Sequence, residues 1–332
     1  MAPRIPRPRP YGPVAIAAVA LIVAMALGLI VALVVVIVGP RHTPVAPAPP
    51  PQRCLAVAGD FASTLDLEQS GNAAIIAGES IRRGLPARAA TIALAAAWQE
   101  SGLRNLDHGD RDSVGLFQQR PSQGWGTIAQ IMDPWYAAGA FYDALVKVPG
   151  WQTGDINDVA QAVQRSGVPD GYRPHESDAR AWASTLTGNS PAALTCLDRG
   201  TTPGDAAAIS ALLTRIWGQQ VTIEPRAGGL LVSTPTETTA WAVAQIALAG
   251  TGLGGVAAVQ VGTQTFTVDP TVLAVWRPAP TPGTSPVAVT GAAPATGSAS
   301  ATSSAPGTST ASPSPLPPPA TVGATQVWIR LR

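Results

Sequence analysis

ARAATIALAAAWQESGLRNLDHGDRDSVGLFQQ, residues 87–119 of this 332-residue chain, gives the strongest indication of its structure. Its first part, Ala87–Gln99, is rich in alanine and contains neither glycine nor proline, so it predicts a helix. One face of that helix carries small residues followed by a carboxylate: Ala89, Ala93, Ala96, Ala97 and Glu100. The stretch therefore predicts a packed helix with a single acid near its end.

An acid at the end of an apolar face is partly withdrawn from water, which favours its neutral form and raises its pKa. A carboxylic acid that stays protonated near neutral pH is what a general acid needs to protonate a glycosidic oxygen. The alternative is a solvated surface carboxylate near a helix end. Periodicity alone leaves both interpretations of Glu100 open.

The order of the motifs after this helix resembles the lysozyme-like superfamily, most closely its lytic transglycosylase and goose-type lysozyme branch. Glu100–Leu103 is followed by the polar, turn-rich stretch Arg104–Ser113 and then by Gly115–Gln119, read Gly-Leu-Phe-Gln-Gln. In that branch a Glu-Ser pair ends a helix and a Gly-Leu-(Met or Phe)-Gln segment follows. The resemblance covers about residues 66–182, and Arg120–Gly126 resembles a secreted actinobacterial subgroup.

The resemblance implies a mainly helical domain that cleaves the β-1,4 bond between N-acetylmuramic acid and N-acetylglucosamine in peptidoglycan. Glu100 matches the family's catalytic acid, and Ser101 matches a residue that hydrogen-bonds near the acetamido group of the reacting sugar. Gln118 matches the glutamine that lines the cleft and binds sugar. Tyr172 matches the aromatic residue that shapes the surroundings of the acid.

One segment departs from the family pattern. The family has an Ala-Tyr-Asn-Ala-Gly-like segment near the end of the domain, and the nearest match is 162–167, with Val163 for the tyrosine and Gln164 for the asparagine. Gln164 can still donate a hydrogen bond to substrate. The departure favours an alternative function, a catalytically inactive lysozyme-like protein that binds the cell wall or assists envelope assembly.

A second carboxylate would distinguish hydrolysis from intramolecular cyclisation, because an inverting hydrolase needs a base that activates water. Asp107, Asp110 and Asp112 lie between the two motif halves, and Asp112 is the first choice for that base. The alternative is that all three form loop turns, helped by Gly109. Without a base, a hydroxyl of the substrate attacks and the reaction is that of a transglycosylase.

Among the aromatic residues there is one further candidate for a sugar contact, and the histidines give no candidate for a metal site. Trp125, in a glycine-rich loop, is a candidate for stacking on a sugar, whereas core positions are favoured for the other tryptophans of this region: Trp98, Trp135, Trp151 and Trp182. The histidines at 42, 108 and 175 are scattered and no metal-binding motif is present, so no metal and no cofactor are expected.

The two cysteines, Cys54 and Cys196, bracket the region of resemblance. If this part of the chain lies outside the cell, the environment permits a disulfide between them. Two unpaired buried thiols are the alternative. A bond would close the ends of a domain and restrict the unfolded chain.

The amino-terminal residues predict a membrane anchor. Val14–Val38 is an uninterrupted apolar run, too long for a signal peptide and without a small-residue cleavage site, so a transmembrane helix over 14–38 is expected. Arg4, Arg7 and Arg9 precede it, which predicts a cytoplasmic segment 1–13 and an extracellular bulk of the chain. Six prolines within 39–53 predict an extended linker.

The fold class expected is multi-domain: a transmembrane helix, a mainly-α lysozyme-like domain over 54–200 and a small α+β domain over 201–277. The second module is expected to run α-β-β-α-β-β, with helices over 205–217 and 237–249. Residues 278–325 carry no charge and 11 prolines, which predicts a disordered low-complexity segment. The alternating residues 326–332 predict an edge strand that returns to the second module.

The overall charge excludes one class of partner. A net charge of +1 with 12% charged residues gives no basic surface for nucleic acid. The partners expected are peptidoglycan glycan strands and the membrane. Nothing in residues 201–277 identifies a ligand, and a protein partner for that module is left open.

Overall fold

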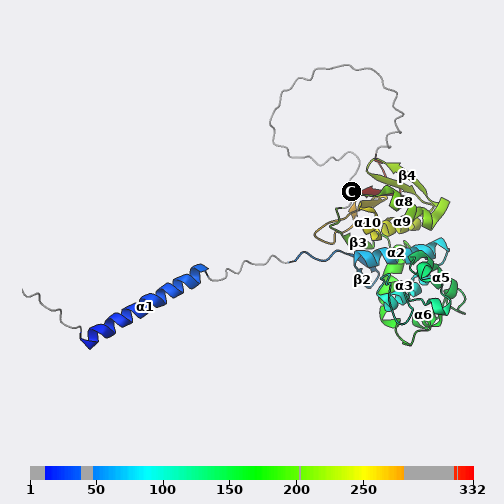
Figure 1. The fold of residues 1–332 in the computed structure, drawn as a ribbon. Coiled ribbons are helices and arrows are strands. Elements are labelled where there is room, and N and C mark those ends of the chain that lie inside the picture. Colours follow the sequence, from blue (N-terminus) through cyan, green and yellow to red (C-terminus); the bar gives the residue numbers. More distant parts are fainter. Residues whose placement is uncertain (1–11, 39–47, 202, 280–317, 320) are drawn as a thin grey trace, which may run out of the picture. The chain divides into compact units, whose positions relative to one another are not determined.

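The computed structural model describes residues 12–38, 48–201, 203–279, 318–319 and 321–332 (Figure 1). The chain divides into two compact units, Met1–Pro49 and Pro50–Arg332. Most of the expected cytoplasmic segment 1–13, most of the linker 39–53 and most of the segment 278–325 lie outside the described residues.

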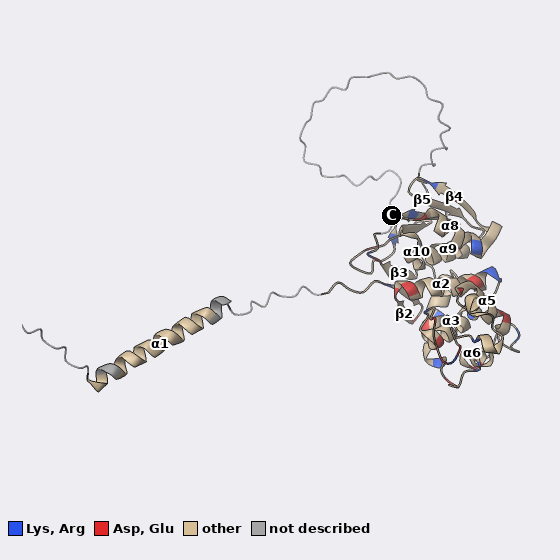
Figure 2. Cartoon of the chain, viewed as in Figure 1, with Lys and Arg blue, Asp and Glu red and all other residues tan. Residues whose placement is uncertain are grey.

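In the first unit, α1 (Pro13–Val38) is the apolar helix that the sequence predicts. Its window Ala17–Val34 has a mean hydropathy of 3.0 and is not buried within the protein. None of its residues is charged, and the described part of its ribbon is tan in Figure 2. At about 1.5 Å per residue, α1 is long enough and apolar enough to cross a bilayer.

The second unit begins with a strand that pairs with strands from both ends of its helical part. The three-stranded antiparallel sheet has the order β2-β1-β3, with β1 at Arg53–Ala58, β2 at Phe61–Leu65 and β3 at Leu194–Leu197. Cys54 and Cys196 are directly opposite each other in this sheet and form a disulfide. The predicted disulfide is therefore confirmed, and it connects neighbouring strands.

Helices make up most of the chain between β2 and β3. They are α2 (Leu67–Arg82), α3 (Ala87–Ser101), α4 (Ile128–Ile131), α5 (Pro134–Leu145), α6 (Ile156–Gln164) and α7 (Glu176–Leu186), with short 3-10 helices η1 (Pro121–Gln123) and η2 (Arg173–His175). The predicted alanine-rich helix is α3, and every residue from Ala89 to Ala97 is buried. Small side chains let α3 lie close to α2, α6 and α7, which all pack against it.

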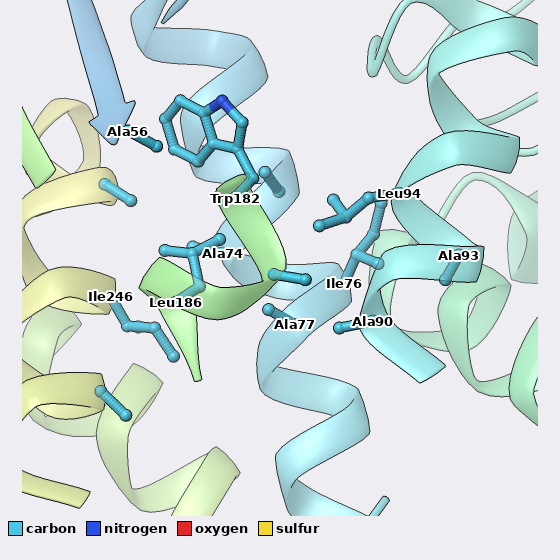
Figure 3. Close-up of a cluster of buried hydrophobic side chains, with 14 of the residues drawn as sticks. Ala56, Ala74, Ile76, Ala77, Ala90, Ala93, Leu94, Trp182, Leu186 and Ile246 are labelled. Carbon is cyan, nitrogen blue, oxygen red and sulfur yellow. The ribbon is translucent and has the colours of Figure 1, made fainter. Parts of the chain in front are cut away.

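Figure 3 shows how these helices share one core. Ala90 and Leu94 from α3 face Ile76 and Ala77 from α2, and Trp182 lies on α7 between α2 and β1; all are buried. The core continues to Ile246, which belongs to the sheet-containing part of the unit.

The sheet-containing part has a six-stranded antiparallel sheet of order β4-β5-β9-β6-β7-β8. Its strands are β4 (Thr222–Arg226), β5 (Gly229–Ser233), β6 (Val256–Val261), β7 (Gln264–Thr267), β8 (Arg277–Pro278) and β9 (Gln326–Leu331). Its helices are α8 (Ala206–Trp217), η3 (Gly218–Gln220), α9 (Glu237–Ala249) and α10 (Thr251–Gly254). The predicted α-β-β-α-β-β elements are all present, and the short helix α10 lies between α9 and β6.

The C-terminal strand does return to this sheet, but its expected position at an edge is wrong. β9 pairs with β5 on one side and with β6 on the other, so it lies inside the sheet. Val327 and Ile329 are completely buried, and Trp328 and Arg330 lie on the opposite face of the strand. Alternation of residue types predicts which faces a strand presents, and it contains no information about the neighbours of that strand.

The helical part and the sheet-containing part are joined by a buried amide on α9. Gln245 is completely buried, and its Oε1 accepts hydrogen bonds from the backbone N–H groups of Ala193 at 2.8 Å and Leu194 at 3.0 Å. Its Nε2 donates to the carbonyls of Thr185 at 2.6 Å and Ser190 at 3.1 Å. Residues 54–200 and 201–332 thus meet across a buried polar contact, and the described helices and sheets are compatible with a multi-domain architecture.

Replacing Gln245 by Ala is expected to lower the free energy of unfolding by about 3–5 kcal/mol, because it leaves buried backbone groups without partners. Gln260→Ala is the control, because the Gln260 amide is part-buried and donates only to the nearby carbonyl of Gly262. Urea unfolding monitored by circular dichroism measures both. Equal effects of the two substitutions would show that the Gln245 contact does not join the two parts.

Candidate functional site

Glu100 lies in the last turn of α3, and the way this helix ends fixes its position. The N–H of Gly102 donates to the carbonyl of Trp98 at 2.9 Å, and the N–H of Leu103 donates to that of Ala97 at 3.1 Å. Gly102 adopts the left-handed conformation, with φ of 61°, that such a helix end requires. The Glu100 carboxyl, half-buried, is thereby held at the wall of a cleft.

Tyr172 is the direct partner of this acid. Its hydroxyl donates to Oε1 of Glu100 at 2.7 Å, and its ring is completely buried. Asn157 on α6 holds the tyrosine, because its Oδ1 accepts the backbone N–H groups of Tyr172 at 3.1 Å and Arg173 at 3.2 Å. Asn157 was not among the residues predicted from the sequence. The one signal for it is its place five residues before 162–167, the segment that departs from the family pattern.

Gln164 lies on the same side of the cleft, at the end of α6. Its Nε2 donates to the carbonyl of Phe117 at 2.9 Å, which ties α6 to the Gly-Leu-Phe-Gln segment. The residue lines the cleft together with Glu100 and Gln118. The structure therefore brings five of the predicted residues together: Glu100, Gln118, Trp125, Gln164 and Tyr172.

The electrostatics of the pair suit proton donation. Burial raises the pKa of Glu100 above its ordinary value, and hydrogen bonding by Tyr172 and Gln164 opposes this rise without cancelling it. Burial and the neighbouring Glu100 charge raise the pKa of Tyr172 as well, so its hydroxyl stays protonated and remains a donor. The cleft thus holds an acid whose neutral form is favoured relative to an exposed glutamate.

Gln118 is positioned by a strained loop. Its backbone is left-handed, with φ of 46°, an uncommon conformation for a residue other than glycine. Its Oε1 accepts from the Ser113 hydroxyl at 3.1 Å, and its Nε2 lies 3.2 Å from the carbonyl of His108 and 3.3 Å from that of Gly115. Backbone strain of this kind is held in place by surrounding contacts and is common at functional sites.

Gly109 makes room for the Gln118 side chain, because a Cβ there would overlap with Gln118 Oε1. Gly109→Ala is therefore expected to displace that amide and lower the free energy of unfolding by about 1–3 kcal/mol. Gly167→Ala is the matched control in the same cleft wall, because a Cβ at Gly167 meets no atom within 4 Å. Denaturant titration measures the difference, and equal stabilities of the two variants would contradict it.

Ser101 holds the backbone and does not line the cleft. Its hydroxyl lies 2.7 Å from the carbonyl of Leu116 and 3.0 Å from that of Ala97, and it accepts the backbone N–H of Arg104 at 3.2 Å. These contacts fix the end of α3 against the Gly-Leu-Phe-Gln segment. The role that the resemblance implies for Ser101, a contact near the sugar, has no counterpart among the residues that line the cleft.

Asp112, the first choice for a base, is engaged elsewhere. It pairs with Arg120 Nε at 2.7 Å and accepts hydrogen bonds from the backbone N–H and the hydroxyl of Ser122. These partners hold the pKa of Asp112 well below its usual range. Asp112 is not among the cleft-lining residues, whereas the exposed Asp110 is, and Asp107 pairs with His108 at 2.8 Å.

Two adjacent hollows make up the cleft. The acid lobe, of about 380 Å³, is lined by Glu100, Asp110 and Gln118. The far lobe, of about 880 Å³, is lined by Tyr136, Lys147 and Pro149, among others. The two lobes are neighbours, because four residues line both: Gln123, Trp125, Gln164 and Arg165.

Trp125 is the tryptophan that both lobes share, and it is half-buried. The hydroxyl of Tyr136 donates to its backbone carbonyl at 3.2 Å, which anchors the loop. Trp151 and Trp182 are buried, as expected of core residues. Trp98 and Trp135 are half-buried; Trp98 stacks on His175, and the Arg215 guanidinium lies 4.5 Å from the Trp135 ring centroid.

Comparison with known proteins provides no family assignment. No protein-family model matches the chain, and no curated protein matches it. The function of the cleft is therefore inferred from the chemistry of its own residues.

Proposed function

We propose that this chain is a membrane-anchored enzyme that cleaves the β-1,4 bond between N-acetylmuramic acid and N-acetylglucosamine in peptidoglycan. The observation that carries the proposal is the half-buried Glu100, which accepts a hydrogen bond from the buried Tyr172 at 2.7 Å at the wall of an open cleft. The resemblance of residues 66–182 to lytic transglycosylases and goose-type lysozymes supports the same assignment.

Glu100 acts as the general acid. Its carboxyl proton passes to the glycosidic oxygen while the bond between that oxygen and the anomeric carbon breaks, which leaves an oxocarbenium-like sugar. Tyr172 orients the carboxyl by its hydrogen bond to Oε1, and the raised pKa of Glu100 keeps the proton available. Gln164 and Gln118, which line the same lobe as the acid, hold the sugar.

The carboxylates around the acid lobe favour a transglycosylase reaction over hydrolysis of the oxocarbenium-like sugar. Among the described residues lining the acid lobe, Asp110 is the one carboxylate besides Glu100, and its side chain is 88% exposed. Asp112 accepts hydrogen bonds from Arg120 and Ser122. With no positioned base for water, a hydroxyl of the same sugar attacks the anomeric carbon and returns its proton to the Glu100 carboxylate, which gives an anhydro end.

The shape of the cleft supports a polymeric substrate. The larger far lobe lies next to the acid lobe, so an extended chain bound at Glu100 can reach it on one side of the bond that breaks. Trp125 offers an indole face at the junction of the lobes, where a sugar ring can stack.

The location we propose is the outer side of a cell membrane. α1 is long and apolar enough to span a bilayer, and the arginines that precede it favour a cytoplasmic amino terminus. The Cys54–Cys196 disulfide fits an oxidising compartment outside the cytoplasm. An anchored enzyme facing outward would meet the peptidoglycan of the cell envelope.

A second candidate is a wall-binding or envelope-assembly protein that keeps the cleft for recognition only. The observation that favours it is the segment around Val163 and Gln164, where the resembling family has tyrosine and asparagine. Val163 is buried, and the Gln164 amide donates one hydrogen bond to the carbonyl of Phe117. In this alternative the cleft binds glycan but does not cleave it.

Digestion of purified peptidoglycan by the full chain in detergent separates the candidates. The expected products carry anhydro ends, whereas reducing ends would indicate a hydrolase. Binding of peptidoglycan without release of any fragment would support the recognition protein. Neither binding nor release would contradict both.

A further inference from the structure

The far lobe of the cleft has an unbalanced charge. Three of its lining residues are charged at neutral pH: Asp143, Lys147 and Arg165. They come from different places in the fold. Asp143 lies within α5, Lys147 follows the end of that helix, and Arg165 follows the end of α6. The net charge of the wall therefore depends on which of the three are neutralised by neighbours.

Asp143 has an ion-pair partner within the described part of the chain, whereas Lys147 and Arg165 do not. The Oδ1 atom of Asp143 pairs with Arg83 Nη1 at 2.7 Å. Arg83 also pairs, at 2.6 Å, with Glu79, whose second partner is Arg82. These four residues balance one another. Among the residues that the structure describes, neither Lys147 nor Arg165 has an ion-pair partner.

Lys147 is the only lysine of the chain, as the other basic residues are arginines. Both Lys147 and Arg165 follow a helix C-terminus, where a cation interacts favourably with the helix dipole. That interaction explains a contribution to helix stability. It does not explain why two cations from different helices, neither with an ion-pair partner among the described residues, line the same hollow next to the acid lobe.

We propose that the far lobe binds an anionic group, a carboxylate or a phosphate, carried by the glycan that is cleaved in the acid lobe. This inference rests on the proposed function and narrows its substrate to glycan strands with charged substituents. The Lys147 ammonium provides a point charge, and the Arg165 guanidinium provides paired N–H donors that match the oxygens of a carboxylate or phosphate. Uncharged sugar hydroxyls need neither cation.

The test measures cleavage by the full chain in detergent and by its variants Lys147→Gln and Arg165→Gln. Removing either charge is expected to raise KM about fivefold on peptide-bearing peptidoglycan with kcat unchanged, as for loss of a solvent-exposed ion pair. Lys147→Arg is expected to keep the wild-type KM. Arg53→Gln removes one positive charge outside the cleft-lining residues and is the control.

Three substrates identify the source of the anion. If the effect disappears on glycan stripped of peptide, the group is a peptide carboxylate; if it disappears on glycan freed of phosphate-linked polymers, the group is a phosphate. An effect that persists on both identifies the lactyl carboxylate of muramic acid. Unchanged KM for both charge-removing variants on all three substrates would overturn the inference.

Binding separates this inference from the proposed reaction. Calorimetry uses the wild-type chain and the same variants with two soluble ligands, a disaccharide-peptide and a phosphate-bearing glycan fragment. Weaker binding of either ligand by Lys147→Gln, in a chain that cleaves nothing, would support the anion site and contradict the enzyme. Cleavage by variants that bind both ligands as the wild type does would support the enzyme and contradict the anion site, and binding of neither ligand by the wild type would overturn the anion site. Melting temperatures equal to the wild type exclude loss of helix stability as the cause.

Discussion

Glu100→Gln is expected to lower the rate of glycan release by the full chain at least about a thousandfold. Glutamine keeps the shape of the side chain and can accept the Tyr172 hydroxyl, but its amide cannot transfer a proton to the leaving oxygen, and general acids contribute about 10²–10⁴-fold to such rates. Quantifying the released fragments by chromatography measures the effect. A rate within tenfold of the wild type would show that Glu100 is not the acid.

Tyr172→Phe is the matched variant, because it removes only the hydroxyl that donates to Glu100. That hydrogen bond lowers the pKa of Glu100, so its loss is expected to raise the pKa further. Because the acid works when protonated, the alkaline limb of the pH profile of kcat is expected to move to higher pH, with a smaller loss of rate than in Glu100→Gln. If the alkaline limb of the kcat profile stays at the wild-type pH, a group other than Glu100 determines it.

The same raised pKa predicts that Glu100→Gln stabilises the fold at neutral pH. Because the folded-state pKa of Glu100 lies above its unfolded value, ionisation opposes folding, and the penalty is complete above the folded pKa and absent below about pH 4. The variant is therefore expected to exceed the wild type in free energy of unfolding at pH 7 and to match it near pH 4. Denaturant titration at both pH values checks the sign.

The sequence predicted the acid of this site better than the geometry around it. The alanine face of residues 89–97 is a local pattern, so helix α3 and its terminal Glu100 followed directly from it. Tyr172 lies 72 residues away and reaches Glu100 only because Asn157 holds its backbone. Such a contact depends on how α6 and η2 pack, which no local pattern contains.

Asp112 and Ser101 differ from their predicted roles for the same physical reason. The position of Asp112 between the two motif halves predicts a base, but its carboxylate accepts a hydrogen bond from Arg120, eight residues later. The resemblance implies a sugar contact for Ser101, but its hydroxyl donates to the carbonyl of Leu116. In both cases a polar side chain near the site found a partner within the protein, which residue spacing does not reveal.

Deletion of Gln326–Arg332 is expected to prevent the second unit from folding cooperatively. The deletion removes an interior strand, leaves β5 and β6 without a shared neighbour and withdraws the buried Val327 and Ile329 from the core. Loss of one buried aliphatic side chain costs about 2–5 kcal/mol, and loss of the paired backbone adds to this, against a total stability of about 5–15 kcal/mol for a typical protein.

The deletion also affects the end of the helical part. Arg332 donates to Asp198 Oδ2 at 2.6 Å, and the Asp198 side chain is 3% exposed. Asp198 follows β3, which carries the disulfide to β1. A buried carboxylate that loses its cation destabilises its surroundings strongly. Residues 54–200 alone lose Arg332 and Gln245 together, so they are expected to give a poorly folded fragment and no glycan release.

Two substitutions in β9 distinguish loss of the strand from loss of chain length. Ile329→Thr is expected to lower the free energy of unfolding by about 2–4 kcal/mol, because it places a hydroxyl in the core. Arg330→Thr, on the exposed face of the same strand, is expected to change it by less than about 1 kcal/mol. Urea titration of both variants and of the deletion measures the series. A deletion variant that unfolds at the wild-type urea concentration would mean that β5 and β6 do not need β9, and the sheet order would then be wrong.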